Sequence, residues 1–231
     1  MAVFSGINKY YKDPSKFKET ADYIKANADN PLGAEPGTKF AYSNYGYVLL
    51  GAIIEKASGQ PYESFLKEKI FDPLGMKDTG MRPEHEHVEG RSKGYTSETQ
   101  AKDEASAGPP YKSNEDTLPY KPTSAGGSYS TANDLLKFAN ALKDNKLISE
   151  ETKKLMITPT QKDNPFAYGS IERENNDGEK SYGHAGGAEG MSSDLQIFEK
   201  SGYAVISLSN LDPPAAIWMS EYASKRLPSR K

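Results

Sequence analysis

Apolar residues in the first third of the chain recur every three to four positions, which is the spacing of amphipathic helices. This spacing predicts helices over residues 14–28, 44–58 and 61–70. The second helix is the clearest, and Gly59 follows it in the position of a glycine C-cap. Residues 84–122 then become polar, rich in Pro, Gly and Ser and poorly periodic, so we expect a long loop excursion there.

The helical spacing returns after that excursion and later gives way to strand-length runs. Thr131 is the expected N-cap of a further helix. Residues 149–152 open a short helix with acidic residues in its first turn, and Pro213-Pro214 starts a last one. The runs expected to form strands are residues 166–171, 181–185, 192–198 and 204–209. Short, turn-rich links separate them, which suits antiparallel hairpins because parallel neighbours need longer crossovers. The expected fold class is α+β, an antiparallel β-sheet flanked by helices plus a helical region.

Length and composition limit the possible domain organisation and function. With 231 residues and no internal repeat, we expect a single domain over residues 1–231. A net charge of -3 argues against nucleic-acid binding, which needs a clustered basic excess. The longest apolar run, residues 47–54, is shorter than the roughly 20 residues of a membrane-spanning helix. The absence of Cys excludes disulfides, thiolate metal sites and a Cys nucleophile.

Three segments stand out for their chemistry. They are Tyr42-Ser43-Asn44 at a predicted helix start, residues 125–135, and Gly183-His184-Ala185-Gly186-Gly187 on a predicted strand. Residues 70–79 and 209–214 accompany them. In this order and spacing, the five segments resemble the serine β-lactamase and penicillin-binding-protein family, in the branch of class C enzymes, DD-peptidases and esterases. The similarity runs along nearly the whole chain and is weakest over residues 84–122.

The resemblance implies roles for individual residues. In this family a serine is acylated by an amide or ester carbonyl and is assisted by a lysine three residues later. Tyr42 matches the tyrosine that helps to move the proton of that serine, and Asn44 matches the asparagine that orients the substrate. His184 matches the histidine of an esterase-like third motif, where other members carry lysine. Gly186 and Gly187 match its substrate-binding backbone, and the N–H of Gly187 falls where the oxyanion hole is completed.

Ordinary structural explanations stand beside these roles. Tyr42 could instead fill a core, Asn44 could cap its helix, and His184 could be a structural histidine of a strand, although the five-segment match favours the site roles for Tyr42 and His184. A phenol with a pKa of about 10 becomes a base at neutral pH only where a neighbouring cation lowers that pKa. Gly186 and Gly187 would let a substrate backbone approach the strand, because no Cβ intrudes.

The resemblance places a Ser-x-x-Lys helix before Tyr42, and no such string stands there in the family's position. Two Ser-x-x-Lys strings occur, at Ser15–Lys18 and Ser64–Lys67. At about 100° per residue, each serine falls on the solvent side of its predicted helix, and the second string also follows Tyr42. We therefore expect a C-terminal portion of the family fold, lacking the N-terminal strands and the nucleophile helix. Such a chain should be inactive as a hydrolase by itself.

That expectation has a structural consequence. Apolar helix surface and one strand edge should be uncovered, which favours marginal stability or association. Either a complementing N-terminal segment or self-association would cover this surface. Residues 1–6 lack the basic and apolar regions of a signal peptide, and proteins of this family are often exported, so the localisation stays open.

The sequence leaves three functions open. One is a serine-hydrolase remnant with a small-molecule or peptide substrate in a cleft. Another is a non-catalytic binding module for peptidoglycan-like peptides or a protein partner. The third is a metal-dependent hydrolase using His85, His87 and His184, and it ranks last because His85 and His87 alternate in a polar loop. We expect no cofactor and no metal.

Overall fold

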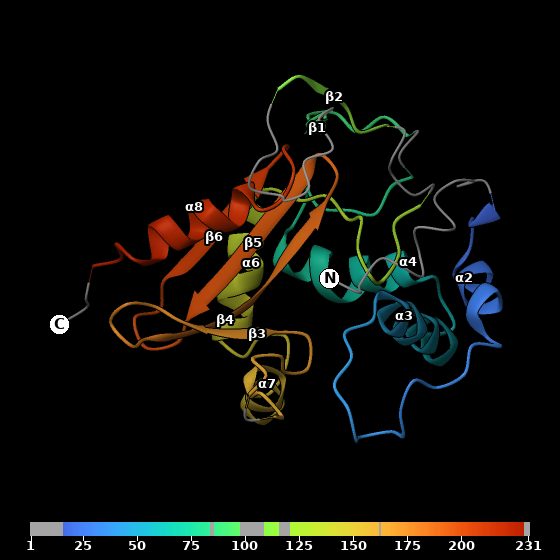
Figure 1. Cartoon of the computed structure of the whole chain (residues 1–231), viewed down its shortest axis with the longest axis horizontal. Coiled ribbons are helices and arrows are strands. Elements are labelled where there is room, and N and C mark those ends of the chain that lie inside the picture. The colour runs from blue at the N-terminus through green and yellow to red at the C-terminus, as the bar shows by residue number, and fades with distance from the viewer. Residues whose placement is uncertain (1–15, 84–85, 98–108, 116–120, 162, 229–231) are drawn as a thin grey trace. The chain divides into compact units, whose positions relative to one another are not determined.

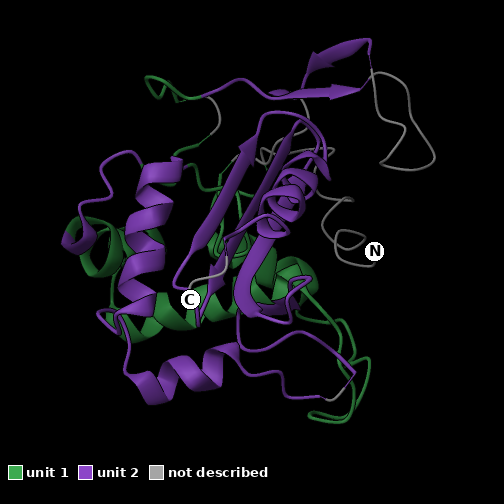
Figure 2. Cartoon of the chain, turned by 90° about the vertical axis from the view of Figure 1, so that its left-hand side faces the viewer, with its two compact units in different colours: residues 1–72, 79–91, 117–129 green, residues 73–78, 92–116, 130–231 purple. Residues whose placement is uncertain are grey.

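The chain divides into two units in a computed structural model. The structure describes residues 16–83, 86–97, 109–115, 121–161 and 163–228. Unit 1 consists of residues 1–72, 79–91 and 117–129, and unit 2 of residues 73–78, 92–116 and 130–231 (Figure 2). The α+β class is confirmed, with an antiparallel sheet flanked by helices in unit 2 and a helical unit 1. The expectation of a single domain over residues 1–231 stays a prediction.

Unit 1 is built on helix α3, Asn44–Ser58, as the apolar spacing predicted. Helix α2, Thr20–Asn27, packs against α3, and α3 packs in turn against α4, Tyr62–Leu66. Phe17, Tyr23 and Val48 form the buried core of these helices. Gly59 ends α3 with a left-handed φ of 73°, which confirms the predicted glycine C-cap.

The helix expected over residues 61–70 forms with an irregular course. After α4 the chain winds more loosely, as the π-helical segment η2 over Lys67–Phe71. It then continues as α5, Asp72–Leu74, past residue 70, where the predicted helix ended. Pro73 thus lies inside α5, directly after the π-helical segment, and does not end the helix.

The sheet of unit 2 has four strands in the order β3-β4-β5-β6, and each neighbouring pair is antiparallel. Their bounds are Ile171–Glu174, Lys180–Ala188, Met191–Phe198 and Ala204–Ser209. The last three agree with the predicted runs. The first prediction was wrong, because residues 167–170 make a turn in which Ala167 N donates to Ser170 O at 2.8 Å. The turn places Phe166 opposite Ile171, so the strand begins where the predicted one ended.

Helices cover both faces of this sheet (Figures 1 and 2). Helix α6, Ala132–Lys143, lies on one face, and helix α8, Ala215–Ser224, lies on the other. The core on the α6 side contains Ala139, Leu142, Tyr182 and Ile197, with helix α7, Glu150–Ile157, packed at its margin. The predicted N-cap Thr131 is confirmed, because its Oγ1 accepts from Asp134 N. The short helix predicted to open at residues 149–152 is also confirmed, and Ser149 Oγ caps it by accepting from Thr152 N.

The expected loop excursion over residues 84–122 contains a short antiparallel pair of strands, β1, Tyr95–Ser97, and β2, Tyr111–Ser113. Its partners lie far along the chain. Tyr95 N donates to Asn210 O at 2.9 Å, and Asn114 Nδ2 donates to Glu189 O at 2.9 Å. Because these bonds join distant segments, local periodicity could not reveal the strands. Among the helices that the structure describes, none is long and apolar enough to cross a membrane.

Candidate active site

Tyr42, Ser43 and Asn44 lie together at the start of α3 in unit 1. Ser43 is extended, with φ -146° and ψ 114°, and its Oγ accepts from Gly46 N at 3.1 Å. Ser43 is therefore the N-cap, and the alternative in which Asn44 caps the helix is wrong. Asn44 is the first helical residue and is buried, with 5% of its surface exposed. A buried amide is positioned by its hydrogen bonds, which suits an orienting residue.

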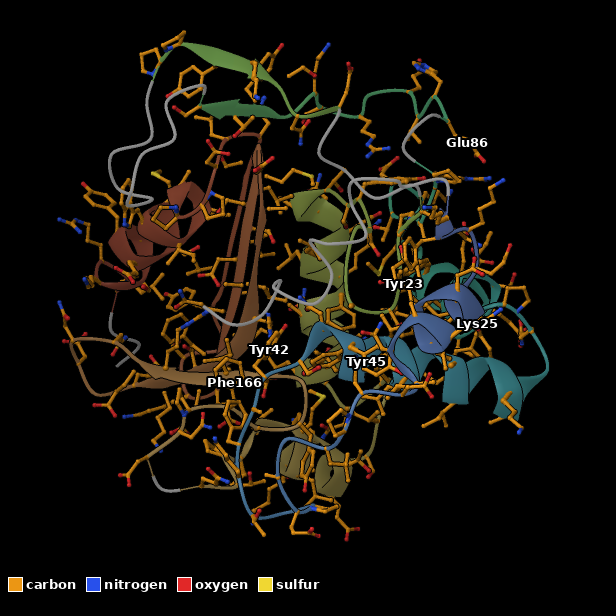
Figure 3. The ribbon with its side chains drawn as sticks, turned by 45° about the vertical axis from the view of Figure 1, so that its right-hand side comes forward. Tyr23, Lys25, Tyr42, Tyr45, Glu86 and Phe166 are labelled. Atoms are coloured by element: carbon orange, nitrogen blue, oxygen red, sulfur yellow. The ribbon has the colours of Figure 1, made fainter. Side chains whose placement is uncertain are left out.

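The phenol of Tyr42 is half-buried beside a second phenol. Its ring centroid lies 5.9 Å from that of Tyr47, one turn into α3. Burial raises the pKa of Tyr42 above its ordinary value of 10, and Tyr47 adds to the rise. The next tyrosine, Tyr45, instead turns toward α2, where its hydroxyl donates to Ile24 O at 3.4 Å (Figure 3). In this state Tyr42 holds its proton, so a base role would require an added cation.

His184 lies on β4 in unit 2 and is half-buried. Its Nδ1 is 2.6 Å from the carbonyl oxygen of Ala185. Since a carbonyl oxygen only accepts, Nδ1 carries the proton, and in the neutral ring Nε2 is then the basic nitrogen. The ring of Phe166 meets the imidazole edge-on at 6.4 Å between centroids. Phe166, labelled in Figure 3, thereby limits the orientations of the ring.

Gly186 and Gly187 lie on the same strand and are exposed. β3 pairs with β4 only as far as Gly183, whereas β5 pairs with β4 up to Ala188. In the part of the chain that the structure describes, no other strand pairs with Gly186 and Gly187. Their backbone therefore has one open side, the geometry with which an extended peptide can add to a sheet.

The two glycines have different reasons for lacking a side chain. A Cβ on Gly187 would lie 2.5 Å from Cγ of Pro213, inside the segment that leads into α8. A Cβ on Gly186 would lie 2.8 Å from the hydroxyl of Ser193, a side chain that can rotate. Packing within the chain is thus a sufficient reason for a glycine at position 187, and substrate binding is not needed to explain it. The expected approach of a substrate backbone stays a prediction for both positions.

Asp212 was not among the predicted site residues, and it holds the end of β4 in place. Its Oδ1 accepts from Gly190 N at 2.7 Å, and its Oδ2 accepts from Ser97 N at 2.8 Å. One carboxylate therefore ties the β4–β5 turn to β1. The Asp-Pro-Pro sequence predicted only a helix start, because both partners are distant in sequence.

A buried ion pair supports the same strand from the neighbouring strands. Asp194 on β5 lies opposite Ala185 and is 1% exposed. Its Oδ1 accepts from Arg173 Nη1 at 3.0 Å, and its Oδ2 accepts from Gln196 Nε2 at 2.8 Å. Both carboxylate oxygens are satisfied, as a buried charge requires. This network fixes β5 directly beside the His184 segment.

The Ser-x-x-Lys string on α4 and η2 does not form a nucleophile pair. Ser64 is exposed, and Lys67 forms an ion pair with Asp72. The solvent-side placement predicted for both residues is confirmed. Ser15 lies outside the described residues, and so does His85 of the metal alternative. The described residues hold no group of three or more His, Asp or Glu side chains that could bind a metal ion.

Comparison with known proteins identifies the family. The sequence model of the family described as Beta-lactamase matches residues 5–226, nearly the whole chain. The chain belongs to the beta-lactamase family. The β-lactamase-like and penicillin-binding-protein-like serine hydrolase family expected from the sequence motifs is thereby confirmed.

Individual relatives agree with this family. Human "Serine beta-lactamase-like protein LACTB, mitochondrial" is 31% identical over 234 residues, covering 89% of this chain and 41% of that protein. Penicillin-binding protein 4* of Bacillus subtilis is 30% identical over 185 residues, covering 76% of this chain and 41% of that protein. A penicillin-binding protein from Bacillus halodurans has the same fold, with a TM-score of 0.82 at 22% identity over 95% of this chain and 66% of its own. The chain thus spans less than half the length of these curated relatives.

Proposed function

We propose that this chain supplies the supporting groups of a serine acyl-transfer site. In this proposal a serine from another segment, assisted by a lysine of that segment, attacks an amide or ester carbonyl, so that the acyl group passes to the serine and the amine or alcohol leaves. Tyr42 and Asn44 lie beside the serine. His184 and the backbone of Gly186 and Gly187 bind the substrate. The chain by itself turns over no substrate. The family match over residues 5–226 carries this proposal, and the solvent position of Ser64 supports its second part.

The protonation of Tyr42 and His184 fits a supporting role. With its pKa raised, Tyr42 is a neutral hydrogen-bond donor at pH 7 and can point its proton at a serine oxygen. A lysine ammonium beside the phenol would lower that pKa and allow the proton to move. His184, with its proton on Nδ1, has Nε2 as an acceptor for a substrate N–H or O–H.

A direct test uses reagents that acylate or phosphonylate an active serine. The purified 231-residue chain is incubated with a fluorophosphonate and, separately, with a penicillin, and its intact mass is measured. We expect no stoichiometric adduct and no turnover of a chromogenic ester, with Ser64→Ala behaving as the unchanged chain does. A stoichiometric adduct mapped to any serine of this chain would overturn the proposal.

Complementation tests the assignment of Tyr42. Joining the chain to a segment that bears the family's Ser-x-x-Lys helix should create esterase or amidase activity. Tyr42→Phe should then lower that activity by about 100-fold, the usual effect of losing a proton-transfer group. If the complemented protein is active and Tyr42→Phe leaves the rate unchanged, the role of Tyr42 is wrong.

The open side of β4 favours a second candidate, a binding module without turnover. An extended, peptidoglycan-like peptide could pair with the exposed backbone of Gly186 and Gly187. In that case such a peptide raises the melting temperature of the chain, and Tyr42→Phe leaves the shift intact. Turnover in the complemented protein would decide against this candidate.

A further inference from the structure

The segment that leads into α8 contacts the last part of β4 at two successive residues. Asp212 Oδ1 accepts from Gly190 N at 2.7 Å, in the turn between β4 and β5. The next residue, Pro213, lies close beside Gly187, since a Cβ added to that glycine would be 2.5 Å from Cγ of the proline. These contacts hold the backbone of Gly187 and of the turn that follows it.

The neighbouring strand is tied to the same segment. Ser192 lies opposite Gly187 in the pairing of β5 with β4, and it is 3% exposed. Its Oγ accepts from Ala216 N, in the first turn of α8, at 3.2 Å. An N–H group in the first turn of a helix has no partner within the helix, so it is available for such a bond. The start of α8 thus fixes the residue of β5 that faces Gly187.

The β1–β2 pair holds the β4–β5 turn as well. Asp212 Oδ2 accepts from Ser97 N at 2.8 Å, and Asn114 Nδ2 donates to Glu189 O at 2.9 Å. Asn114 is 2% exposed, and a Cβ added to Gly190 would lie 2.8 Å from Cβ of this asparagine. Connecting turns are usually more mobile than the strands they join. This turn is instead bonded to two distant segments, and Asp212 takes part in the contacts of both.

Only a carboxylate can make both bonds of Asp212. The two N–H groups approach different oxygens, and an ionised carboxylate accepts at both of them. An asparagine has one accepting oxygen and would turn its NH2 group toward the other N–H, so it keeps one bond at most. Gly190 is buried, and a buried N–H without an acceptor is costly. The residue type at position 212 therefore determines how firmly the turn is held.

We propose that Asp212 is a positioning residue for acyl transfer, which holds the N–H of Gly187 where the oxyanion of the tetrahedral intermediate develops. This inference rests on the function proposed above. An oxyanion donor is effective because it is in place before the charge appears. A displacement of about 1 Å in such a site can slow a reaction about 100-fold. Asp212 acts through Pro213 and the β4–β5 turn, and it touches neither the substrate nor the attacking serine.

Glu179 provides a matched control at the opposite end of β4. Its Oε1 accepts from Ser201 N at 2.6 Å, which ties the residue before β4 to the turn between β5 and β6. Like Asp212, it is a partly buried carboxylate that accepts from a backbone N–H in a turn of the sheet. Glu179 lies about 25 Å along the strand from Gly187, at about 3.3 Å per residue. Loss of either carboxylate should lower stability, but only Asp212 lies where its loss can displace Gly187.

The test measures turnover of a chromogenic ester by the full chain joined to a segment that bears the family's Ser-x-x-Lys helix. Complete reaction with a fluorophosphonate counts the active serines, so that kcat refers to folded protein alone. We expect Asp212→Ala to lower kcat about 100-fold and Asp212→Asn, which keeps one bond, to lower it about tenfold. KM should stay nearly constant, because the oxyanion exists only after the substrate has bound. Glu179→Ala should leave both constants unchanged.

Hydrogen exchange tests the positioning in the 231-residue chain without any added segment. In Asp212→Asn, the amides of residues 187–190 should exchange about tenfold faster, because the turn opens locally. The amides of β6 should keep the rates of the unchanged chain. An equal acceleration throughout the sheet would mean that Asp212 contributes overall stability alone, and the inference would be wrong.

The outcomes for the joined protein separate this inference from the proposed function. A folded, joined protein without activity would defeat the acyl-transfer proposal and this inference with it. An active protein in which Asp212→Ala lowers kcat no more than Glu179→Ala would defeat the inference alone. A rise in KM at constant kcat would also count against it, because Asp212 would then affect substrate binding and not the oxyanion.

Discussion

The start of α3 and the strand β4 carry the residues that match the family motifs, and different contacts hold them. At α3, Ser43 bonds to Gly46 and the ring of Tyr42 lies against Tyr47, both a few positions along the chain. On β4, Gly183 lies against the next strand, and Gly187 lies against the segment before α8. The first arrangement is largely local, and the second depends on packing between distant segments.

This difference indicates at which positions a small substitution should strongly lower the stability of the protein. A local cap is one of several contributions to a helix, so its loss leaves the rest of α3 in place. A backbone wedged between two strands has no room to move, because protein interiors are close-packed. Adding a methyl group at Gly183 or Gly187, the two closely packed glycines of β4, should therefore destabilise the protein more than removing the cap at the start of α3.

The largest effect is expected for Gly183→Ala. A Cβ there would lie 1.9 Å from the carbonyl oxygen of Leu195, a backbone atom that cannot swing away. We expect a loss of about 3 kcal/mol or more in the free energy of unfolding, measured by urea denaturation. Gly33→Ala is the control, since nothing lies within 4 Å of its Cβ position. Equal stabilities for the two variants would show that close packing at Gly183 does not make a Cβ there costly.

Gly187→Ala and Gly186→Ala form a sharper pair on one strand. The Cβ of the first would meet the rigid ring of Pro213, whereas that of the second would meet the rotatable hydroxyl of Ser193. We expect a loss of about 1–2 kcal/mol for Gly187→Ala and less than about 0.5 kcal/mol for Gly186→Ala. If thermal or urea unfolding shows a larger loss for Gly186→Ala than for Gly187→Ala, contact with Pro213 is not the reason for a glycine at position 187.

Ser43→Ala should have a smaller effect than Gly183→Ala or Gly187→Ala. It removes the oxygen that accepts from Gly46 N, and loss of such a cap costs about 1 kcal/mol. Ser43→Asp supplies another acceptor and should recover most of that loss. If Ser43→Asp is as unstable as Ser43→Ala, Ser43 does not stabilise the protein through its capping hydrogen bond.

A further effect appears only in alkaline solution. Burial, with a contribution from Glu199, raises the pKa of Tyr182 on β4 to about 12, from 10.0. A raised pKa means that folding favours the protonated phenol, so this stability is complete below about pH 10 and is lost as pH rises toward about 12. Urea unfolding between those values should show Tyr182→Phe losing less stability than the unchanged chain. Tyr42→Phe should reduce the loss too, since the pKa of Tyr42 is also raised.

Several elements could be predicted from the sequence because their signals are local. The apolar spacing and the following glycine identified α3 and its end at Gly59. Thr131 was recognised as a cap, since a cap acts within three residues. The prediction of a strand over residues 166–171 failed because a turn formed by Ala167 and Ser170 redirects the chain. The strands β1 and β2 were missed because their partners, such as Asn210, are distant in sequence.

The candidate site divides in the same way. Its residues Tyr42, Asn44 and His184 could be named from motifs, because their types and spacing match a family. The protonation states of Tyr42 and His184 could not be predicted from these motifs. The raised pKa of Tyr42 comes from burial, and the proton position on His184 comes from the carbonyl oxygen of Ala185 that the strand holds against it. The sequence also gave no sign that Asp212 holds the β4–β5 turn, because its partners Gly190 and Ser97 are brought to it only by the fold.

The sequence by itself determined the α+β class, the family and the capped helices, since periodicity, caps and motif spacing act over a few residues. Only the tertiary structure decided which glycines are forced by packing and which carboxylates are buried. It also decided that uncharged β6 and charged β3 are the two edge strands of the sheet that the structure describes. The physical reason is that burial and strand pairing are properties of distant segments brought together. No stretch of sequence contains them until the chain has folded.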